Sequence, residues 1–143
     1  MRQLIPDIEV SAIEINAKAA ERCSKIPGVH VHNESIYEFD SDEQFDLTLV
    51  SGVLIHQNPE KLPEAYDQLY THSRRYVLII EYYNPTPVTV TYRGNEDRLF
   101  KRDFAGEFMD RHPDVKLLGY GFQYHRDPVF PVDDATWFLM EKK

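Results

Sequence analysis

Hydrophobic and polar positions along the chain follow two periods, and these predict strands that alternate with helices. Residues 9–15 alternate apolar and polar side chains and predict a strand, and residues 29–32 predict a second, shorter one. Residues 45–56, FDLTLVSGVLIH, form an almost continuous apolar run, which predicts a strand buried on both faces, as in a parallel sheet. The strongest strand signal is YVLIIEYY at residues 76–83.

Between these strands the apolar residues recur at helical spacing. Asn16 is a suitable cap for a helix over residues 17–24. Asn58 is a suitable cap for a second helix, with Pro59 at its first position, and residues 100–111 predict a third. The apolar faces consist of Leu62, Ala65, Tyr66 and Leu69 in the second helix and of Phe104, Phe108 and Met109 in the third.

The order of these elements predicts an α/β fold. Strands joined through helices indicate a parallel sheet with crossover helices, so that residues 45–51 and 76–82 are expected to be parallel neighbours. Residues 84–93 contain two prolines and predict an irregular loop. Residues 115–124 and 136–141 predict two last strands without a long helix between them, which indicates an antiparallel hairpin. We therefore expect a three-layer sandwich with a Rossmann-like, mostly parallel sheet.

Composition narrows the class of protein. A length of 143 residues predicts one domain over residues 1–143. The net charge of −8 argues against a nucleic-acid partner, and no apolar run is long enough for a membrane span. The start lacks the apolar segment of a signal peptide, and the single cysteine, Cys23, excludes an internal disulfide. These features favour the cytoplasm. His30 and His32 are the one pair with ligand-like spacing, and we expect no metal site.

Three segments at the ends of predicted strands carry a family resemblance: AIEIN at residues 12–16, NESIYEF at 33–39 and LVSGVLIHQNPEKL at 49–62. Their order resembles the class I S-adenosylmethionine-dependent methyltransferases. In that family the second strand ends in an acid that holds the ribose, the third is followed by residues beside the adenine, and the fourth opens at the methyl-transfer site. The resemblance thus implies S-adenosyl-L-methionine as cofactor, held by Glu14, Ile15, Ser35, Ile36, Ser51 and Gly52. It also places the strand at 136–141 between those at 76–82 and 116–124.

The second half of the chain is similar to one subgroup. The segments GVLIHQNPEKLPEAY, EYYNPTPVTVTYRG, DRLFKRDFAGEFMD and GFQYHRDPVFPVDDATWFLMEK resemble the methylases associated with pseudaminic acid biosynthesis. This resemblance covers nearly the whole chain from Pro6 onward. It implies methyl transfer to a hydroxyl or amine of a sugar-acid precursor or glycan, and it leaves a homodimer open.

Further side chains are candidates for catalysis and substrate binding. His56 is a candidate general base, because its ordinary pKa lies near neutrality, although a loop histidine beside a helix start is the more ordinary interpretation. Tyr82, Tyr83 and Asn84 follow the strongest strand, where ligands of α/β proteins usually bind, yet two aromatic rings can also simply cover the end of a sheet. The candidates for holding a sugar carboxylate are Arg93, Arg98, Lys101 and Arg102, which otherwise form a solvated helix start.

One expected feature of the family has no counterpart in these residues. The family begins with a strand and a glycine-rich loop that approaches the methionine part of the cofactor, whereas only MRQLIP stands before the first predicted strand region. We therefore expect a partial domain without its first strand and weak cofactor binding. A truncated, non-catalytic module for binding a ligand or partner is the alternative to an enzyme. For the sheet we expect residues 9–15 to pair directly with 45–51, the other outcomes being a second chain in the gap or an unstable fragment.

Overall fold

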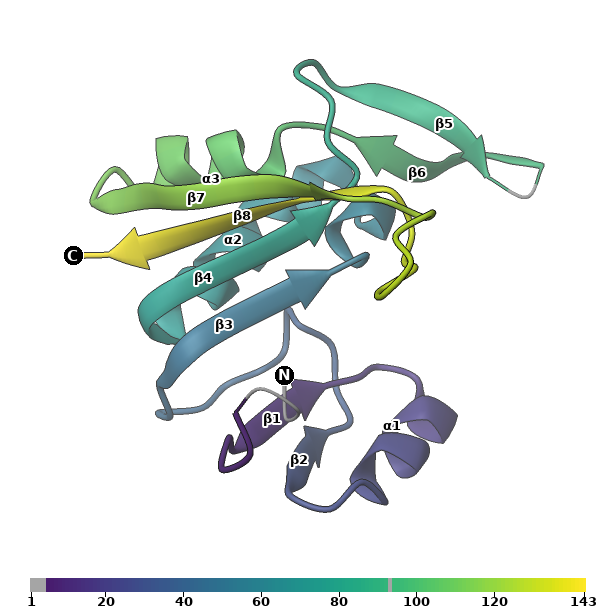
Figure 1. The fold of residues 1–143 in the computed structure, drawn as a ribbon. Helices are drawn as coiled ribbons and strands as arrows, with labels where there is room; N and C mark the ends of the chain where they lie inside the picture. Colours follow the sequence, from purple (N-terminus) through teal and green to yellow (C-terminus); the bar gives the residue numbers. More distant parts are fainter. Residues whose placement is uncertain (1–4, 93) are drawn as a thin grey trace. The chain divides into compact units, whose positions relative to one another are not determined.

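The computed structural model describes residues 5–92 and 94–143, and the side chains of residues 95–98 lie outside the described part. The chain forms two compact units, Met1–Ser41 and Asp42–Lys143. Each unit has its own sheet, and the larger unit has a separate two-stranded ribbon as well (Figure 1).

The first unit is a strand–helix–strand arrangement. Strands β1 (Val10–Ile13) and β2 (Val29–His32) are parallel, and α1 (Ala17–Ser24) connects them. The side-chain oxygen of Asn16 accepts hydrogen bonds from the backbone N–H groups of Lys18 and Ala19, at 3.0 and 3.2 Å. The predicted helix and its cap are therefore confirmed.

The second unit has a four-stranded sheet in the order β3-β4-β8-β7. Strands β3 (Phe45–Ser51) and β4 (Ser73–Glu81) are parallel neighbours, as predicted. Strand β8 (Ala135–Lys142) is antiparallel to both β4 and β7 (Val115–Gln123) and lies between them. The predicted closing hairpin and the inner position of its last strand are confirmed.

The expected pairing of residues 9–15 with 45–51 would join the two compact units and stays a prediction. Within the first unit β1 pairs with β2, and within the second unit β3 pairs with β4.

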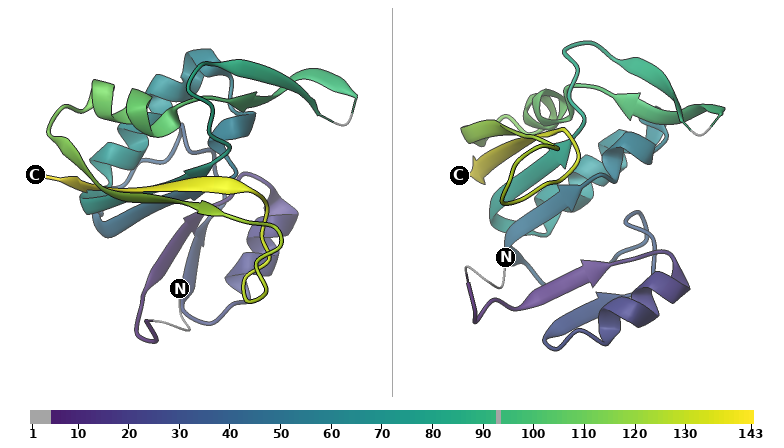
Figure 2. Two further views of the ribbon diagram at one scale, coloured as in Figure 1. Left: turned by 45° about the horizontal axis from the view of Figure 1, so that its top comes forward. Right: turned by 45° about the vertical axis from the view of Figure 1, so that its right-hand side comes forward.

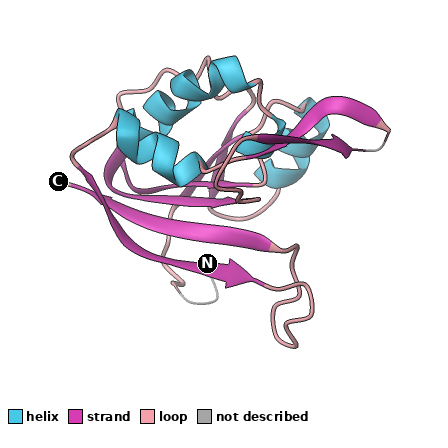
Figure 3. Cartoon of the chain, turned by 90° about the horizontal axis from the view of Figure 1, so that it is seen from above, coloured by secondary structure: helices cyan, strands magenta, loops and turns pink. Residues whose placement is uncertain are grey.

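Two helices cover one face of the four-stranded sheet (Figures 2 and 3). Helix α2 (Leu62–Thr71) follows two short 3₁₀ turns, η1 (Leu54–His56) and η2 (Pro59–Lys61). It buries the predicted face, which consists of Leu62, Ala65, Tyr66 and Leu69. Below the helices lie Val77 and Ile79 of β4 and Met140 of β8, each at most 1% exposed. This layer is the core of the second unit.

Helix α3 (Phe104–Arg111) starts later than the predicted 100–111. The side chain of Asp103 accepts a hydrogen bond from the backbone N–H of Gly106 at 2.8 Å and thereby fixes the first turn. Phe104 and Phe108 are buried against the sheet, as predicted. Residues 100 and 101 belong instead to the preceding strand.

The predicted irregular loop at 84–93 is wrong in its second half. Strands β5 (Val88–Tyr92) and β6 (Asn95–Lys101) form an antiparallel ribbon that extends away from the four-stranded sheet (Figure 1). The sequence VTVTY is β-branched and aromatic, which favours a strand, and both prolines precede it. The two prolines therefore predict irregular backbone only for the residues before β5.

Strand β3 is also less buried than the apolar run predicted. Within it only Val50 is buried, whereas Asp46, Leu49 and Ser51 are exposed. One residue of the seven is buried, so the prediction of burial on both faces is wrong. No helix in the described residues is long and apolar enough to cross a membrane.

Two glycines of β7 provide a test of packing within the sheet. A Cβ atom at Gly121 would lie 2.7 Å from Nε1 of Trp137, whereas at Gly119 the nearest Trp137 atom would be 3.7 Å away. We expect Gly121→Ala to lower the free energy of unfolding by about 1–3 kcal/mol, because the indole has to shift. The matched variant Gly119→Ala is expected to change it by less than about 0.5 kcal/mol. Urea unfolding of both variants checks this, and equal losses would contradict it.

Candidate active site

A cavity opens where parallel strands β3 and β4 end. Its volume is about 570 Å³. The walls consist of Ser51, Gly52, Ile55, His56, Ile80, Glu81, Tyr82, Tyr92, Leu99, Gln123, Val132, Asp133 and Ala135. The carboxyl ends of parallel strands are the usual place for ligands in α/β proteins. Four residues proposed from the sequence, Ser51, Gly52, His56 and Tyr82, therefore line one cavity.

A sharp turn after β3 forms one wall. Gly52 has a φ of 63°, a conformation that glycine adopts without strain, and apart from its two chain neighbours no residue has a heavy atom within 4 Å of the position a Cβ would take. Its backbone N–H donates to the carbonyl of Ile80 at 3.0 Å. The turn thus presents open backbone toward the cavity while it stays attached to β4.

A buried carboxylate holds the residues that follow this turn. Glu81, at the end of β4, is 3% exposed. Its Oε1 accepts hydrogen bonds from the backbone N–H groups of Val53 and Leu54, at 2.9 and 3.0 Å, and its Oε2 accepts one from Ile55 at 3.4 Å. Burial raises the pKa of Glu81, and the three N–H donors oppose that rise. Glu81 therefore fixes the first turn of η1 and the approach to His56.

His56 ends η1 and is exposed at the wall of the cavity. Its ring lies 5.5 Å from the ring of Tyr92, centroid to centroid. Tyr92 belongs to the β5–β6 ribbon, so this ribbon contributes to the cavity as well. The arrangement places an imidazole, the usual group for proton transfer near neutral pH, beside the space for a ligand.

Tyr82 forms a second polar contact in the wall. Its hydroxyl donates to Oδ2 of Asp133 at 3.3 Å, and Nζ of Lys101 lies 5.3 Å from the centre of its ring. Burial, followed by the charge of Asp133, raises the pKa of Tyr82. The phenol is therefore a neutral hydrogen-bonding group at ordinary pH.

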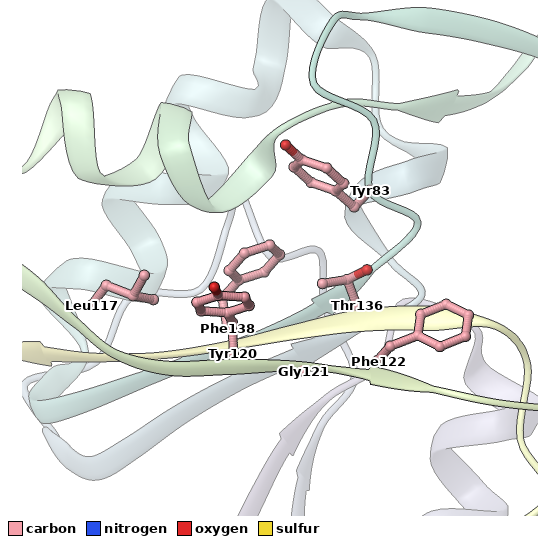
Figure 4. A pocket seen from close by; sticks show the side chains of 7 residues that line it. All are labelled: Tyr83, Leu117, Tyr120, Gly121, Phe122, Thr136 and Phe138. Carbon is pink, nitrogen blue, oxygen red and sulfur yellow. The ribbon is translucent and has the colours of Figure 1, made fainter. Parts of the chain in front are cut away.

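Tyr83 and Asn84 do not line this cavity. Successive residues of a strand point to opposite faces, and Tyr83 lies in a separate hollow on the helix side of the sheet, 5.8 Å from the ring of Phe138 (Figure 4). The side-chain amide of Asn84 donates to the carbonyl of Thr86 at 2.6 Å. Asn84 thus shapes the loop that leaves β4.

The basic residues proposed for substrate binding are placed differently from one another. Lys101 lies over Tyr82, as described, whereas Nε of Arg102 is 2.7 Å from Oε1 of Glu107 in a half-buried ion pair. Arg93 and the side chain of Arg98 lie outside the described residues. Lys101 is therefore the described basic candidate beside the cavity.

The remaining cofactor candidates belong to the first unit. The side-chain amide of Asn33 donates to the backbone carbonyls of Glu14 and Ile15, at 2.7 and 3.2 Å, and so ties the end of β1 to the segment that carries Ser35 and Ile36. Oε1 of Glu14 accepts the backbone N–H of Asn16 at 2.7 Å. The roles of these candidates stay predictions.

The residues of the cavity that were not candidates from the sequence include Glu81, Tyr92 and Asp133. The sequence could have indicated Glu81 as a site residue, because it is the single acid in the apolar run YVLIIEYY. Tyr92 was assigned to an irregular loop, and the contact of Asp133 with Tyr82 spans 51 residues of sequence. In residues 5–92 and 94–143 no group of three or more His, Cys, Asp and Glu side chains is arranged to hold a metal.

No protein-family model matches the sequence, and no curated protein is significantly similar to it. Solved structures are similar. The 1,6-didemethyltoxoflavin-N1-methyltransferase of Burkholderia thailandensis, with bound S-adenosylhomocysteine, matches with a TM-score of 0.73 and 15% identity, over 98% of this chain and 64% of that chain. The chain has a methyltransferase fold.

Two further methyltransferases, both in complex with S-adenosylhomocysteine, agree with this fold. The N-methyltransferase NodS of Bradyrhizobium japonicum WM9 matches with a TM-score of 0.69 and 13% identity, over 99% of this chain and 70% of that chain. The glycopeptide N-methyltransferase MtfA matches with a TM-score of 0.71 and 12% identity, over 99% of this chain and 76% of that chain. The chain thus spans 64–76% of the length of these three methyltransferases.

Proposed function

We propose that the chain acts in methyl transfer from S-adenosylmethionine to a hydroxyl or amine of a sugar acid of the pseudaminic acid type, or of its precursor or glycan, in the cytoplasm. The observation that carries the proposal is the cavity at the ends of β3 and β4, which combines the open Gly52 turn with His56 and Tyr82. The methyltransferase fold and the resemblance of the second half of the chain support it. Glu14 would hold the ribose and Ser35 with Ile36 the adenine, as the resemblance implies.

The residues of the cavity suit this reaction. When bound, the cofactor supplies a methyl group already activated on a sulfonium. An acceptor oxygen or nitrogen that takes this methyl group would have to release a proton, and the chain would have to hold the acceptor in line. His56 would take this proton, Tyr82 would orient the acceptor, and Lys101 would attract a carboxylate. Glu81 would keep the backbone before His56 in place.

The test measures transfer of labelled methyl to nonulosonic acid acceptors, together with calorimetric binding of S-adenosylhomocysteine. We expect His56→Asn to lower the transfer rate by about 10²-fold or more, because asparagine cannot accept the proton, while cofactor binding is unchanged. The exposed histidine of β2, in the variant His30→Asn, is the matched control. An equal loss in both variants would refute the role of His56.

Cofactor binding gives a separate result. We expect weak, saturable binding with a dissociation constant of roughly 0.1 mM or above, weakened further in Glu14→Gln but not in Glu9→Gln. Tight binding of the cofactor that is unchanged in Glu14→Gln would contradict the role of Glu14 in holding the ribose. Binding of the sugar acid without any label transfer would favour the alternative, a non-catalytic binding module.

A further inference from the structure

Strand β7 has an open edge in the second unit. It pairs with β8 along one side, and no other strand of the described residues pairs with it. An open edge presents a row of backbone N–H and C=O groups that a further strand can bind. Natural proteins usually protect such edges with charges, prolines or bulges.

The protection of this edge is weak. Large apolar side chains of β7 are exposed: Leu117 by 41%, Leu118 by 51%, Tyr120 by 68% and Phe122 by 63%. The strand, VKLLGYGFQ, has no proline and a single charge, at Lys116. Its one irregularity lies between Leu117 and Gly119 and leaves the segment from Gly119 onward in regular pairing with β8. The other edge strand of the sheet, β3, exposes one large apolar side chain, Leu49, and carries Asp46.

An aromatic hollow lies beside this edge. It has a volume of about 480 Å³, and Figure 4 shows the rings of Tyr120 and Phe138 next to each other with Tyr83 above them. Tyr120 and Phe138 are stacked, with centroids 6.2 Å apart. A small molecule would be held on one side only, because Tyr120 and Phe122 are more than 60% exposed, whereas binding pockets usually enclose most of their ligand. A strand at the open edge would both satisfy the backbone and cover these rings.

We propose that β7 pairs antiparallel with β7 of a second copy of this chain, and that aromatic side chains of each copy cover the hollow of the other. The same strand supplies an open backbone edge and apolar side chains, so one two-fold axis satisfies both copies and closes the assembly. Antiparallel pairing also keeps like charges apart, since Lys116 stands near one end of β7 and the two copies of it would lie at opposite ends of the pair.

Sedimentation velocity over about 1–200 µM tests the dimer, with circular dichroism to confirm folding. We expect a concentration-dependent dimer with a dissociation constant in the micromolar range, as is common for small interfaces. Tyr120→Lys places a charge at the edge and should weaken the dimer at least about tenfold. Val129→Lys is the matched control. Val129 is 69% exposed but belongs to the loop that connects β7 to β8, so this variant should leave the dissociation constant of the dimer unchanged. A monomer at every concentration, or equal loss in both variants, would overturn the proposal.

Disulfide cross-linking tests the orientation in a Cys23→Ser background. Tyr120→Cys, near the middle of β7, should form covalent dimers on mild oxidation, whereas Lys116→Cys should not. Efficient cross-linking through residue 116 alone would exclude the antiparallel pair. Saturable binding of indole to a monomeric chain, lost in Tyr120→Lys, would also overturn the proposal and assign the hollow to a small molecule.

Discussion

Replacement of Glu81 by alanine is expected to lower the free energy of unfolding by about 3–5 kcal/mol, because a buried acceptor is removed from several backbone donors at once. Glu81 is 3% exposed and accepts hydrogen bonds from Val53, Leu54 and Ile55. Without the carboxylate these N–H groups lose their partner in a site that water reaches poorly. The residues from the end of β3 to His56 should then loosen, and ligand binding in the cavity should fall with them.

Two variants separate this role from a general loss of charge. Glu81→Gln keeps the shape and one acceptor oxygen, so we expect a smaller loss, about 1–2 kcal/mol. Glu60→Ala removes an exposed glutamate of η2 and should stay within about 0.5 kcal/mol of the parent chain. Urea unfolding provides the energies. A loss in Glu81→Ala no larger than in Glu60→Ala would show that the carboxylate does not hold the turn.

The pH dependence follows from the direction of the shift. Burial raises the pKa of Glu81 above its ordinary value of 4.5, so the folded chain holds this proton more tightly than the unfolded chain. The resulting contribution to stability is complete below pH 4.5 and is lost as the pH rises through the folded pKa. The stability advantage of the parent chain over Glu81→Gln should therefore be larger at pH 4 than at pH 7, as measured by urea unfolding at both values.

Periodicity and local capping predicted the elements whose bounds are set by residues within or directly beside the element. The face of α2 was predictable because Leu62, Ala65, Tyr66 and Leu69 recur at helical spacing, and α1 because Asn16 caps it. The start of α3 was not predictable in this way, because the hydrophobic side chain of Phe100 is compatible with a helix and with a strand. The hydrogen bond from Gly106 to the Asp103 cap and the pairing of β6 with β5 determine where the helix starts.

The cavity was predictable in outline because parallel strands end at one edge. That rule brought Ser51, Gly52, His56 and Tyr82 together from two segments. It could not separate Tyr82 from Tyr83, which depends on the direction of each side chain at the end of β4. It also could not find contacts made over long separations, such as those of Glu81 with the η1 turn and of Tyr82 with Asp133.

Replacement of Glu107 by alanine is expected to lower the free energy of unfolding by about 2–4 kcal/mol, because two partly buried partners lose their acceptor together. Oε2 of Glu107 accepts the hydroxyl hydrogen of Tyr66 at 2.8 Å, and Oε1 pairs with Nε of Arg102 at 2.7 Å. Tyr66 is 3% exposed, and the side chains of Arg102 and Glu107 are 19% and 29% exposed. The contact joins α2 to α3 and to the end of the β5–β6 ribbon.

A double-mutant cycle with Tyr66→Phe isolates one half of this network. If Glu107 acts through the tyrosine hydroxyl, the losses in Glu107→Ala and Tyr66→Phe should fall short of additivity by about 1 kcal/mol or more. Asp110→Ala, an exposed acid on the same helix, is the control, and additivity of the losses in Glu107→Ala and Tyr66→Phe would refute the coupling.

The stability at alkaline pH provides an independent test. Burial, and then the hydrogen bond to Glu107, raise the pKa of Tyr66, so its contribution is complete below pH 10 and is lost as the pH rises further. The parent chain should thus lose stability above pH 10 more steeply than Tyr66→Phe does, because the variant lacks the Tyr66 phenol, which ionises more readily in the unfolded chain than in the folded one.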